Sequence, residues 1–271
     1  MIRYAKFLVK LILAIIDKSR RFIRLNPSLN GYIYFFDKVN KKFFKIFSRE
    51  KVDSITADQI FTNHCYNLQF LRRYDELQKI YNSIVKSGKT PLIIDCGSNI
   101  GLSTIYFAEL FPEAKIVSIE PEINNFNLMK KNCNKLKNVI FLNAAIGSEK
   151  GFVSIANSHG DNNSFRTVIS KKLNSIELVL LNDIFIQNHT DVPFIVKIDI
   201  EGFENNLFEK NTSWVKKTPL IIIEPHDWML PNAANFRNFL KVISSENRDF
   251  IIQGENVYSL LNVKKNINDS N

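Results

Sequence analysis

The 271-residue chain is predicted to fold as an α/β protein with a doubly wound, mainly parallel sheet. Five short runs are largely apolar, as strands buried on both faces of a parallel sheet are; they are residues 92–95, 116–120, 139–143, 194–199 and 220–224. Amphipathic stretches near 100–110, 122–136, 203–209 and 232–246 have the spacing of helices between such strands. Gly254-Glu255 joins two late runs, 250–253 and 256–260, which predicts an antiparallel C-terminal hairpin.

Composition adds a basic extension to this core. Hydrophobic residues make up 45% of the chain and charged residues 23%, so a sizeable core can form. Residues 1–51 contain 13 Lys and Arg against 3 Asp and Glu, a net of +10, whereas the remainder contains 23 against 24. We therefore expect a basic, helical extension over 1–60, a main domain over 61–263 and a polar tail over 264–271. Within the main domain, 61–90 is a leading helix and 91–263 is the core.

The extension begins with an apolar run, residues 7–16, that Lys10 interrupts. A membrane-spanning helix needs about 20 mostly apolar residues, and no small-residue cleavage site follows, so we predict neither a spanning helix nor a removed signal peptide. Apolar residues gather on one side of this helix, and aromatic residues lie beside lysines in 35–47. This pattern favours contact with an anionic membrane surface, or else a helix that packs on the main domain or on a partner.

Cysteine usage points to a reducing compartment. The chain has three cysteines, an odd number, and they lack the spacing of a disulfide framework or a zinc site: Cys65, Cys96 and Cys133. We expect a cytoplasmic protein, peripherally associated with the inner face of the membrane if the extension touches lipid.

A glycine-containing turn follows the first expected strand and reads Asp95-Cys-Gly97-Ser98-Asn99-Ile-Gly101. Gly97 allows a tight turn and a close approach of the backbone to a ligand, and Gly101 lets the next helix lie against the strand. The N-terminus of that helix presents free N–H groups. In doubly wound sheets, ligands bind beyond the carboxyl ends of the strands, so this turn is the first part of a predicted cofactor site.

The next two strand ends supply the rest of that site. Glu120 and Pro121 end the second strand, where a carboxylate can accept hydrogen bonds from both hydroxyls of a ribose. Asn143 and Ala144 end the third strand and are expected beside an adenine ring, where a small side chain leaves room. Together with the glycine turn, these residues predict an adenosine-containing cofactor.

The turn distinguishes between two classes of such cofactor. Dinucleotide sites use three glycines to place a pyrophosphate on the helix end, but here Asn99 replaces the middle glycine. Asp95 would repel a pyrophosphate, whereas S-adenosylmethionine carries an ammonium and a sulfonium group. We therefore predict S-adenosylmethionine, with a nicotinamide or flavin dinucleotide as the weaker alternative.

Charged residues follow the fourth and fifth expected strands, although unpaired charges are costly in a core. Lys197, Asp199 and Glu201 alternate and share one side of an extended backbone, and Glu224 and His226 follow the fifth strand. We interpret these five residues as the catalytic group. His226 or Asp199 is the expected base, and Lys197 orients carboxylates or stabilises developing negative charge. The alternative is an ion pair that closes the sheet end.

A metal is not part of this predicted site. Asp199, Glu224 and His226 are plausible ligands of a divalent ion at neighbouring strand ends. No short ligand motif supports such an ion, so a metal-free site is favoured over a metal-dependent one.

Three segments in this order resemble the FkbM-type methyltransferase family: Asp95-Cys-Gly-Ser-Asn-Ile-Gly101, Ile119-Glu-Pro121 and Lys197-Ile-Asp-Ile-Glu-Gly-Phe-Glu204. The resemblance covers about residues 91–226, and Leu181-Asn-Asp183 departs from the family's Leu-Asp-Asp by one residue. It implies a Rossmann-like, class I methyltransferase fold and S-adenosylmethionine-dependent O-methylation, often of sugar or polyketide hydroxyls. The expected acceptor is therefore a hydroxyl of a sugar or glycan, as in cell-surface polysaccharide or a related natural product.

Two other functions remain as alternatives. A nucleic-acid methyltransferase could use the basic extension to bind phosphates, but the nearly neutral main domain argues against a nucleic-acid partner. Enzymes that methylate base amines place an Asn/Asp-Pro-Pro-aromatic loop after the fourth strand, where this chain has Asp199-Ile-Glu-Gly202. A non-catalytic adapter that keeps the fold is the other alternative, and it does not explain the intact Asp95, Glu120 and Asp199. The sequence leaves the oligomeric state open.

Overall fold

The computed structural model describes residues 2–18, 20–26, 30–63, 65–157, 165–169 and 175–262; the expected polar tail lies outside them. Seven strands form the central sheet in the order β13-β14-β12-β11-β4-β5-β6. Their bounds are β4 Thr90–Cys96, β5 Lys115–Ile119, β6 Val139–Leu142, β11 Asp191–Ile198, β12 Leu220–Ile223, β13 Arg248–Gln253 and β14 Asn256–Leu261. The strands from β12 to β6 pair in parallel, and β14 is antiparallel to both of its neighbours. The predicted mainly parallel sheet with a C-terminal hairpin is confirmed.

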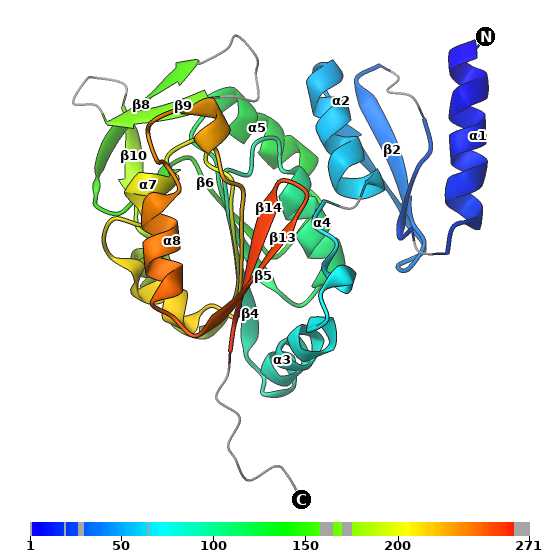
Figure 1. Cartoon of the computed structure of the whole chain (residues 1–271). Helices are drawn as coiled ribbons and strands as arrows, with labels where there is room; N and C mark the ends of the chain where they lie inside the picture. Colours follow the sequence, from blue (N-terminus) through cyan, green and yellow to red (C-terminus); the bar gives the residue numbers. More distant parts are fainter. Residues whose placement is uncertain are drawn as a thin grey trace, which may run out of the picture.

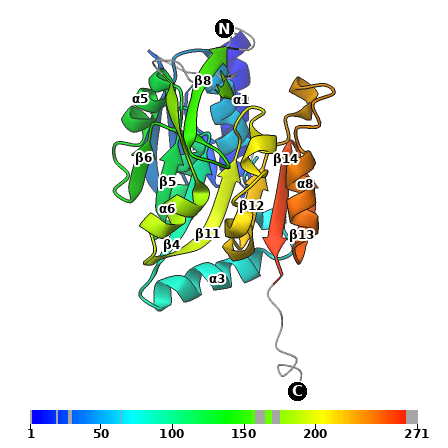
Figure 2. The same cartoon turned by 90° about the vertical axis from the view of Figure 1, so that its left-hand side faces the viewer.

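Helices cover both faces of this sheet (Figure 1, Figure 2). One face carries α3 (Tyr74–Lys86), α4 (Leu102–Leu110) and α5 (Ile123–Asn132), and the other carries α6 (Leu181–Gln187), α7 (Glu204–Leu207) and α8 (Arg237–Ser244). Successive residues of a strand point to opposite faces, so Ile93 belongs to the first core and Ile94 to the second. Because both cores are apolar, the strands read as continuous apolar runs.

The chain changes direction at the centre of the sheet, between β4 and β11. It passes from β4 to β5 and β6 on one side, and later to β11 and β12 on the other. The loops that follow β4 and β11 therefore approach each other closely at the carboxyl edge. Gly97 has φ +78°, and a Cβ atom there would lie 1.7 Å from the carbonyl oxygen of Asp199. Only glycine fits this crossing.

A smaller sheet lies beyond the carboxyl end of β6. It contains β7 (Ala145–Ile146), β8 (Gly151–Asn157), β9 (Phe165–Ile169) and β10 (Ile176–Val179), in the order β7-β10-β8-β9. Its buried residues Ala145, Val153 and Leu178 form a small core with Phe203. This core fixes the segment after β6 against the loop after β11.

The prediction of a helical extension is wrong for residues 22–47. Helices α1 (Ile2–Ile16) and α2 (Lys51–Ala57) are present, followed by a π-helical turn η1 (Asp58–Thr62) and a 3₁₀ turn η2 (Leu68–Phe70). Between α1 and α2, however, β1 (Phe22–Arg24), β2 (Tyr32–Asp37) and β3 (Lys42–Phe47) form an antiparallel sheet. Ile33, Phe35 and Ile46 are fully buried, whereas Tyr34 and Phe43 are exposed. The aromatic residues therefore alternate with period two, which is the signature of a half-buried strand.

This extension packs on the main domain and shares its core. Phe22 and Phe61 contact the ring of Tyr106 in α4, and Lys42 forms a 2.7 Å ion pair with the buried carboxylate of Glu109. In Figure 1, α1 lies on the outer side of the three-stranded sheet, away from the main sheet. Among the described residues, no helix combines the length and the apolar character that a membrane crossing requires.

Candidate active site

A cleft at the carboxyl edge of the sheet, here the first cleft, brings together the strand ends that the sequence singled out. It is lined by Gly97, Asn99, Ile119, Glu120, Pro121, Asn125, Ala144, Ala145, Ile146, Asp199, Ile200, Glu201 and Phe203. The β4, β5, β6 and β11 ends all contribute, because parallel strands place their carboxyl ends on the same edge. The lining therefore joins the predicted cofactor residues to the predicted catalytic ones.

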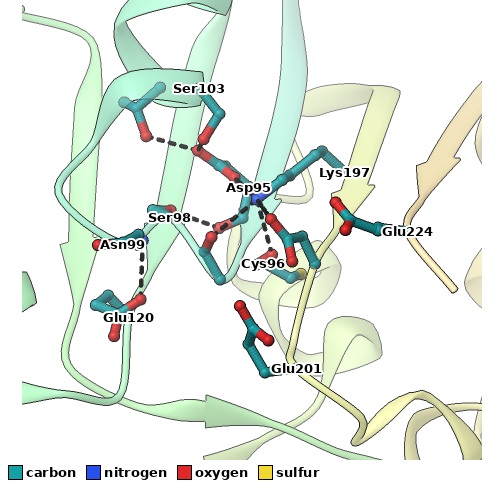
Figure 3. A network of polar contacts seen from close by, with 12 residues as sticks. Asp95, Cys96, Ser98, Asn99, Ser103, Glu120, Lys197, Glu201 and Glu224 are labelled. Atoms are coloured by element: carbon teal, nitrogen blue, oxygen red, sulfur yellow. Dashed lines mark hydrogen bonds and ion pairs between the residues drawn. The ribbon is translucent and has the colours of Figure 1, made fainter. Parts of the chain in front are cut away.

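Glu120 lies in the wall of the first cleft with 5% of its surface exposed. Its Oε2 accepts a hydrogen bond from the backbone N–H of Asn99 at 2.8 Å, and its Oε1 accepts one from the N–H of Glu122 at 2.9 Å. Burial raises the pKa of Glu120 to about 7, although these hydrogen bonds oppose the change. The carboxylate thus links the ends of β4 and β5 (Figure 3).

Two side-chain amide oxygens in the first cleft lack a hydrogen-bond partner. The Oδ1 atoms of Asn99 and Asn125 are buried without one. A buried polar atom normally has a partner, so both atoms indicate a ligand with hydrogen-bonding groups. Asn125 was missed by sequence reasoning because it lies in the first turn of α5, outside any strand end. Asn143 is exposed, and its amide instead donates to the carbonyl oxygens of Glu120 and Pro121.

Asp95 lies beneath the clefts rather than on their surface. Its side chain is fully buried, and its Oδ2 accepts hydrogen bonds from the hydroxyls of Ser103 and Thr104, both at 2.7 Å. Its Oδ1 lies 3.2 Å from Nζ of Lys197. Lys197 also donates to the carbonyl oxygen of Gly97 at 2.8 Å. In this arrangement, Asp95 and Lys197 hold the glycine turn in place, and Asp95 is absent from the lining of both clefts.

The remaining residues of the turn have local structural roles. The hydroxyl of Ser98 donates to the carbonyl oxygen of Asp95 and accepts from the N–H of Ile119, which ties β4 to β5. Gly101 has φ +88°, and a Cβ atom there would lie 2.7 Å from Sγ of Cys133, which follows α5, and 3.0 Å from Cγ of Met129 in α5. The predicted close packing of a helix at Gly101 therefore involves α5 as well as α4.

The five predicted catalytic residues lie together at the ends of β11 and β12. The imidazole of His226 is 2% exposed, and three carboxylates surround its Nε2 atom: Asp199 at 3.6 Å, Glu201 at 3.7 Å and Glu224 at 3.8 Å. Burial and, after it, the charge of Asp199 raise the pKa values of Glu201 and Glu224 to about 8. Burial lowers the pKa of His226, but Glu204 and the other carboxylates outweigh it and raise the value to about 10.

Glu204 is a further residue of this group, and sequence reasoning gave it no separate role. It is fully buried at the start of α7, and its Oε1 lies 2.8 Å from Nδ1 of His226. It also accepts hydrogen bonds from the N–H of Gly202 and the amide of Asn235. Glu204 therefore fixes the orientation of the imidazole through its Nδ1 side, opposite the three carboxylates near Nε2.

A second cleft opens on the other side of the same carboxylates. It shares Gly97, Asn99, Asp199 and Glu201 with the first cleft. Its remaining lining comes from separate parts of the chain: Asp53, Thr56, Gln59, Ile60, Asn63, Cys65, Tyr66, Ser98, Ile100, Leu102, Ser103, Lys197, Glu224, Trp228, Glu255 and Asn256. Residues 53–63 belong to α2, η1 and the residue after η1. No motif in the sequence placed them at the site, because only tertiary packing brings them there.

Comparison with known proteins assigns the family. The sequence profile of the FkbM methyltransferase domain matches residues 95–252, which is more than half of the chain. The chain belongs to the FkbM methyltransferase family. This FkbM methyltransferase is thus an S-adenosylmethionine-dependent enzyme, as the turn after β4 and the acidic end of β5 predicted. The resemblance seen in the sequence is confirmed.

Other similarities of the FkbM methyltransferase are more distant. It is 31% identical over 74 residues to methyltransferase sdnD of Sordaria araneosa, and this match covers 27% of the chain and 22% of that protein. The chain thus matches about a fifth of that relative's length. Among solved structures, the O-methyltransferase TomG of Streptomyces achromogenes, in complex with S-adenosylmethionine, has 13% identity and a TM-score of 0.42, covering 68% of this chain and 79% of that one. The Bacillus cereus O-methyltransferase in complex with S-adenosylhomocysteine has 12% identity and a TM-score of 0.40, covering 69% and 81%.

Proposed function

We propose that this enzyme transfers the methyl group of S-adenosylmethionine to a hydroxyl group of a sugar or glycan intermediate. The observation that carries the proposal is the junction of the two clefts, where Asp199 and Glu201 belong to both linings. A methyl donor in one cleft and an acceptor in the other would meet at these carboxylates. Holding nucleophile and methyl group in line supplies much of the acceleration of such a displacement.

The first cleft suits the adenosine part of the cofactor. We assign Glu120 to the ribose hydroxyls, and the unpartnered amide oxygens of Asn99 and Asn125 to polar atoms of the nucleoside. An apolar wall for the adenine ring is formed by Ala144, Ala145 and Ile146, and Pro121 lines the same cleft. When bound, S-adenosylmethionine supplies an activated methyl group. The remaining predicted cofactor residues are assigned an indirect role, in which they set the shape of the loops around the cofactor: Asp95, Gly97, Ser98, Gly101 and Asn143.

The second cleft suits a hydroxylated acceptor. Its lining includes the exposed polar side chains of Gln59 and Asn63. Such groups match the many donors and acceptors of a sugar. Trp228 is 75% exposed at this cleft, where an indole offers an apolar face together with one N–H donor. The family resemblance adds the preference for sugar hydroxyls.

A carboxylate is the better candidate for the base than His226. An aliphatic hydroxyl must lose its proton as the new bond forms, and the base has to reach that proton. Asp199 and Glu201 are 26% and 27% exposed, whereas His226 lies behind them with 2% exposed. The hydroxyl would therefore meet a carboxylate first. The sequence left His226 and Asp199 open as the base. Asp199 is favoured because it is more exposed than His226, and Glu201 is a second candidate for the same reason.

The extension is proposed to contact an anionic membrane surface. Helix α1 exposes Leu8, Val9, Ile12, Leu13, Ile15 and Ile16, each by more than half of its surface. An outward apolar face on a strongly basic segment is the pattern of helices that lie in the membrane interface. Such contact would keep the enzyme close to lipid-linked or surface glycan intermediates.

Titration calorimetry tests the cofactor assignment first. S-adenosylhomocysteine is expected to bind with micromolar affinity, whereas NAD is not. Glu120→Ala should weaken binding at least tenfold because a hydrogen bond to a charged group contributes about 1.5–3 kcal/mol. Glu113→Ala, on the exposed surface between α4 and β5, is the matched control. Binding of NAD in place of S-adenosylhomocysteine would reject the assignment.

Transfer of a labelled methyl group tests the acceptor class. Glycosides with free hydroxyls should accept the label, whereas the fully O-methylated glycosides and RNA should not. Loss of transfer in Asp199→Asn with retained S-adenosylhomocysteine binding would support a carboxylate base. Transfer to RNA alone would refute the proposed acceptor.

A further inference from the structure

Resting on the function proposed above, we propose that Asp199, Glu224 and His226 bind a divalent cation of the Mn²⁺ or Mg²⁺ class, which holds the hydroxyl groups of the acceptor. One ligand atom from each residue lies within 4.8 Å of the other two. The sequence did not favour a metal because these residues form no local ligand motif. Pairing of β11 with β12, which aligns Ile198 with Ile223, brings Asp199 and Glu224 to adjacent strand ends.

The distances within the group suit a shared ion better than direct hydrogen bonds. Nε2 of His226 lies 3.6 Å from Oδ1 of Asp199 and 3.8 Å from Oε1 of Glu224, beyond hydrogen-bonding range. Around an octahedral ion with bonds of about 2.1 Å, neighbouring ligand atoms lie about 3.0 Å apart and opposite ones about 4.2 Å. The two separations from Nε2 fall between these values, and all three ligand atoms lie within 4.8 Å of one another, so small side-chain movements would complete the coordination.

The second ring nitrogen of His226 is held as metal-binding histidines usually are. Metal-bound imidazoles typically donate their other N–H to a carboxylate, which fixes the ring and the tautomer. Here Nδ1 lies 2.8 Å from Oε1 of Glu204, a fully buried carboxylate that Gly202 and Asn235 hold in place. This pairing leaves Nε2 facing Asp199 and Glu224, where a metal ion would take the place of its proton.

The local charge also calls for a cation. Asp199, Glu201 and Glu224 all approach one imidazole edge, and carboxylates gathered in a partly buried site repel one another when ionised. Lys197 contacts Asp199 at 3.5 Å but is shared with the fully buried Asp95. A divalent ion between the carboxylates would compensate the remaining negative charge.

The mixed ligand set indicates which ions fit and what they would do. Two carboxylates with one imidazole suit Mn²⁺ and, less closely, Mg²⁺, with water or acceptor oxygens at the other positions. Two neighbouring hydroxyls of a sugar can occupy such positions. The acceptor oxygen then forms its bond to the methyl carbon as the carbon–sulfur bond breaks. Its proton passes to Glu201, the other candidate base, because Asp199 is then a ligand of the ion. The products are a methyl ether and S-adenosylhomocysteine.

Binding of Mn²⁺ to the full-length protein, after treatment with EDTA and desalting, tests the cation site without an activity assay. The electron paramagnetic resonance signal of free Mn²⁺ should fall with a stoichiometry of one ion per chain, and Mg²⁺ should compete. Glu224→Gln and His226→Gln should each weaken Mn²⁺ binding at least tenfold. Glu204→Gln, which changes only the support of the imidazole, should weaken it about 10–100-fold.

Asp227→Asn is the matched control, because it removes a carboxylate next to His226 in sequence that is not part of the ligand group. It should bind Mn²⁺ as the wild type does. The proposal would be overturned if the wild type bound no Mn²⁺ at 1 mM ion, a concentration about the dissociation constant of weak sites. Equal Mn²⁺ binding by Glu224→Gln and Asp227→Asn would also overturn it.

Titration of the same samples with S-adenosylhomocysteine separates this proposal from the proposed function. Retained S-adenosylhomocysteine binding shows that a variant is folded, so a selective loss of Mn²⁺ supports the site. A wild type that binds S-adenosylhomocysteine but not Mn²⁺ would reject the cation alone. One that binds Mn²⁺ but not S-adenosylhomocysteine would uphold the cation and reject its part in methyl transfer.

Discussion

Replacing Glu120 by Gln should make the protein more stable at pH 8 and flatten the pH dependence of its unfolding. The Glu120 carboxyl is nearly fully buried, and burial raises its pKa to about 7 from an ordinary value of 4.5. Between these two pH values the folded state binds more protons at this position than the unfolded state does. Stability contributed by the protonated group is therefore fully present below pH 4.5 and is lost as the pH rises through 7.

The size of this effect follows from the two pKa values. A rise from 4.5 to about 7 corresponds to about 3 kcal/mol of lost stability once the pH is above 7, at 1.36 kcal/mol for each pKa unit. Gln cannot ionise, but it offers one acceptor oxygen to the two backbone N–H groups that Glu120 now binds. Losing one of these hydrogen bonds costs about 1 kcal/mol at any pH. The variant should therefore be about 2 kcal/mol more stable than the wild type at pH 8.

Urea unfolding followed by circular dichroism at pH 5 and pH 8 measures the effect. The wild type should lose more than about 2 kcal/mol relative to Glu120→Gln between these pH values, because most of the titration falls in this range. Glu113→Gln, at an exposed position, should follow the wild type. If the stability difference between Glu120→Gln and the wild type is the same at both pH values, the assigned burial of an ionisable carboxyl is wrong.

Three further changes test other parts of the structure. Gly97→Ala should lower the free energy of unfolding by more than about 3 kcal/mol because its Cβ would overlap a backbone carbonyl. Gly88→Ala, also at positive φ but with open space around it, should lower it by about 1 kcal/mol. Equal melting temperatures of the two variants would contradict this. Lys197→Met should cost about 3–5 kcal/mol in urea unfolding because it leaves a buried carboxylate unpaired, and Lys210→Met, on an exposed pair, should have no measurable effect. Ile12→Glu should reduce sedimentation with anionic vesicles, and neutral vesicles are the control; unchanged sedimentation would remove α1 from membrane contact.

Local sequence patterns carried most of the fold. Strands buried on both faces are apolar at most positions, so β4, β5, β11 and β12 could be recognised without knowing their partners. The turn at Gly97 was equally visible, because a positive φ and a close backbone crossing both require glycine. The family motif and the acidic end of β5 then predicted the cofactor class.

Alternation was harder to recognise in the extension. In 32–47, aromatic residues occupy both faces of the strands, so Phe35 and Phe43 look alike in the sequence although one is buried and the other exposed. Period-two burial became evident only when the three-stranded sheet was packed on α4. The same packing placed residues 53–63 in the second cleft, far in sequence from the motifs of the main domain.

By itself, the sequence determined the doubly wound core, the edge at which ligands bind and the residue types gathered there, because these depend on local burial and backbone conformation. Only the tertiary structure decided how those residues divide their roles. It buried Asp95 beneath the clefts and paired it with Lys197, set His226 behind Asp199 and Glu201, and placed Glu204 against the imidazole. Distances between separate strand ends set these relations, and no spacing along the chain encodes them.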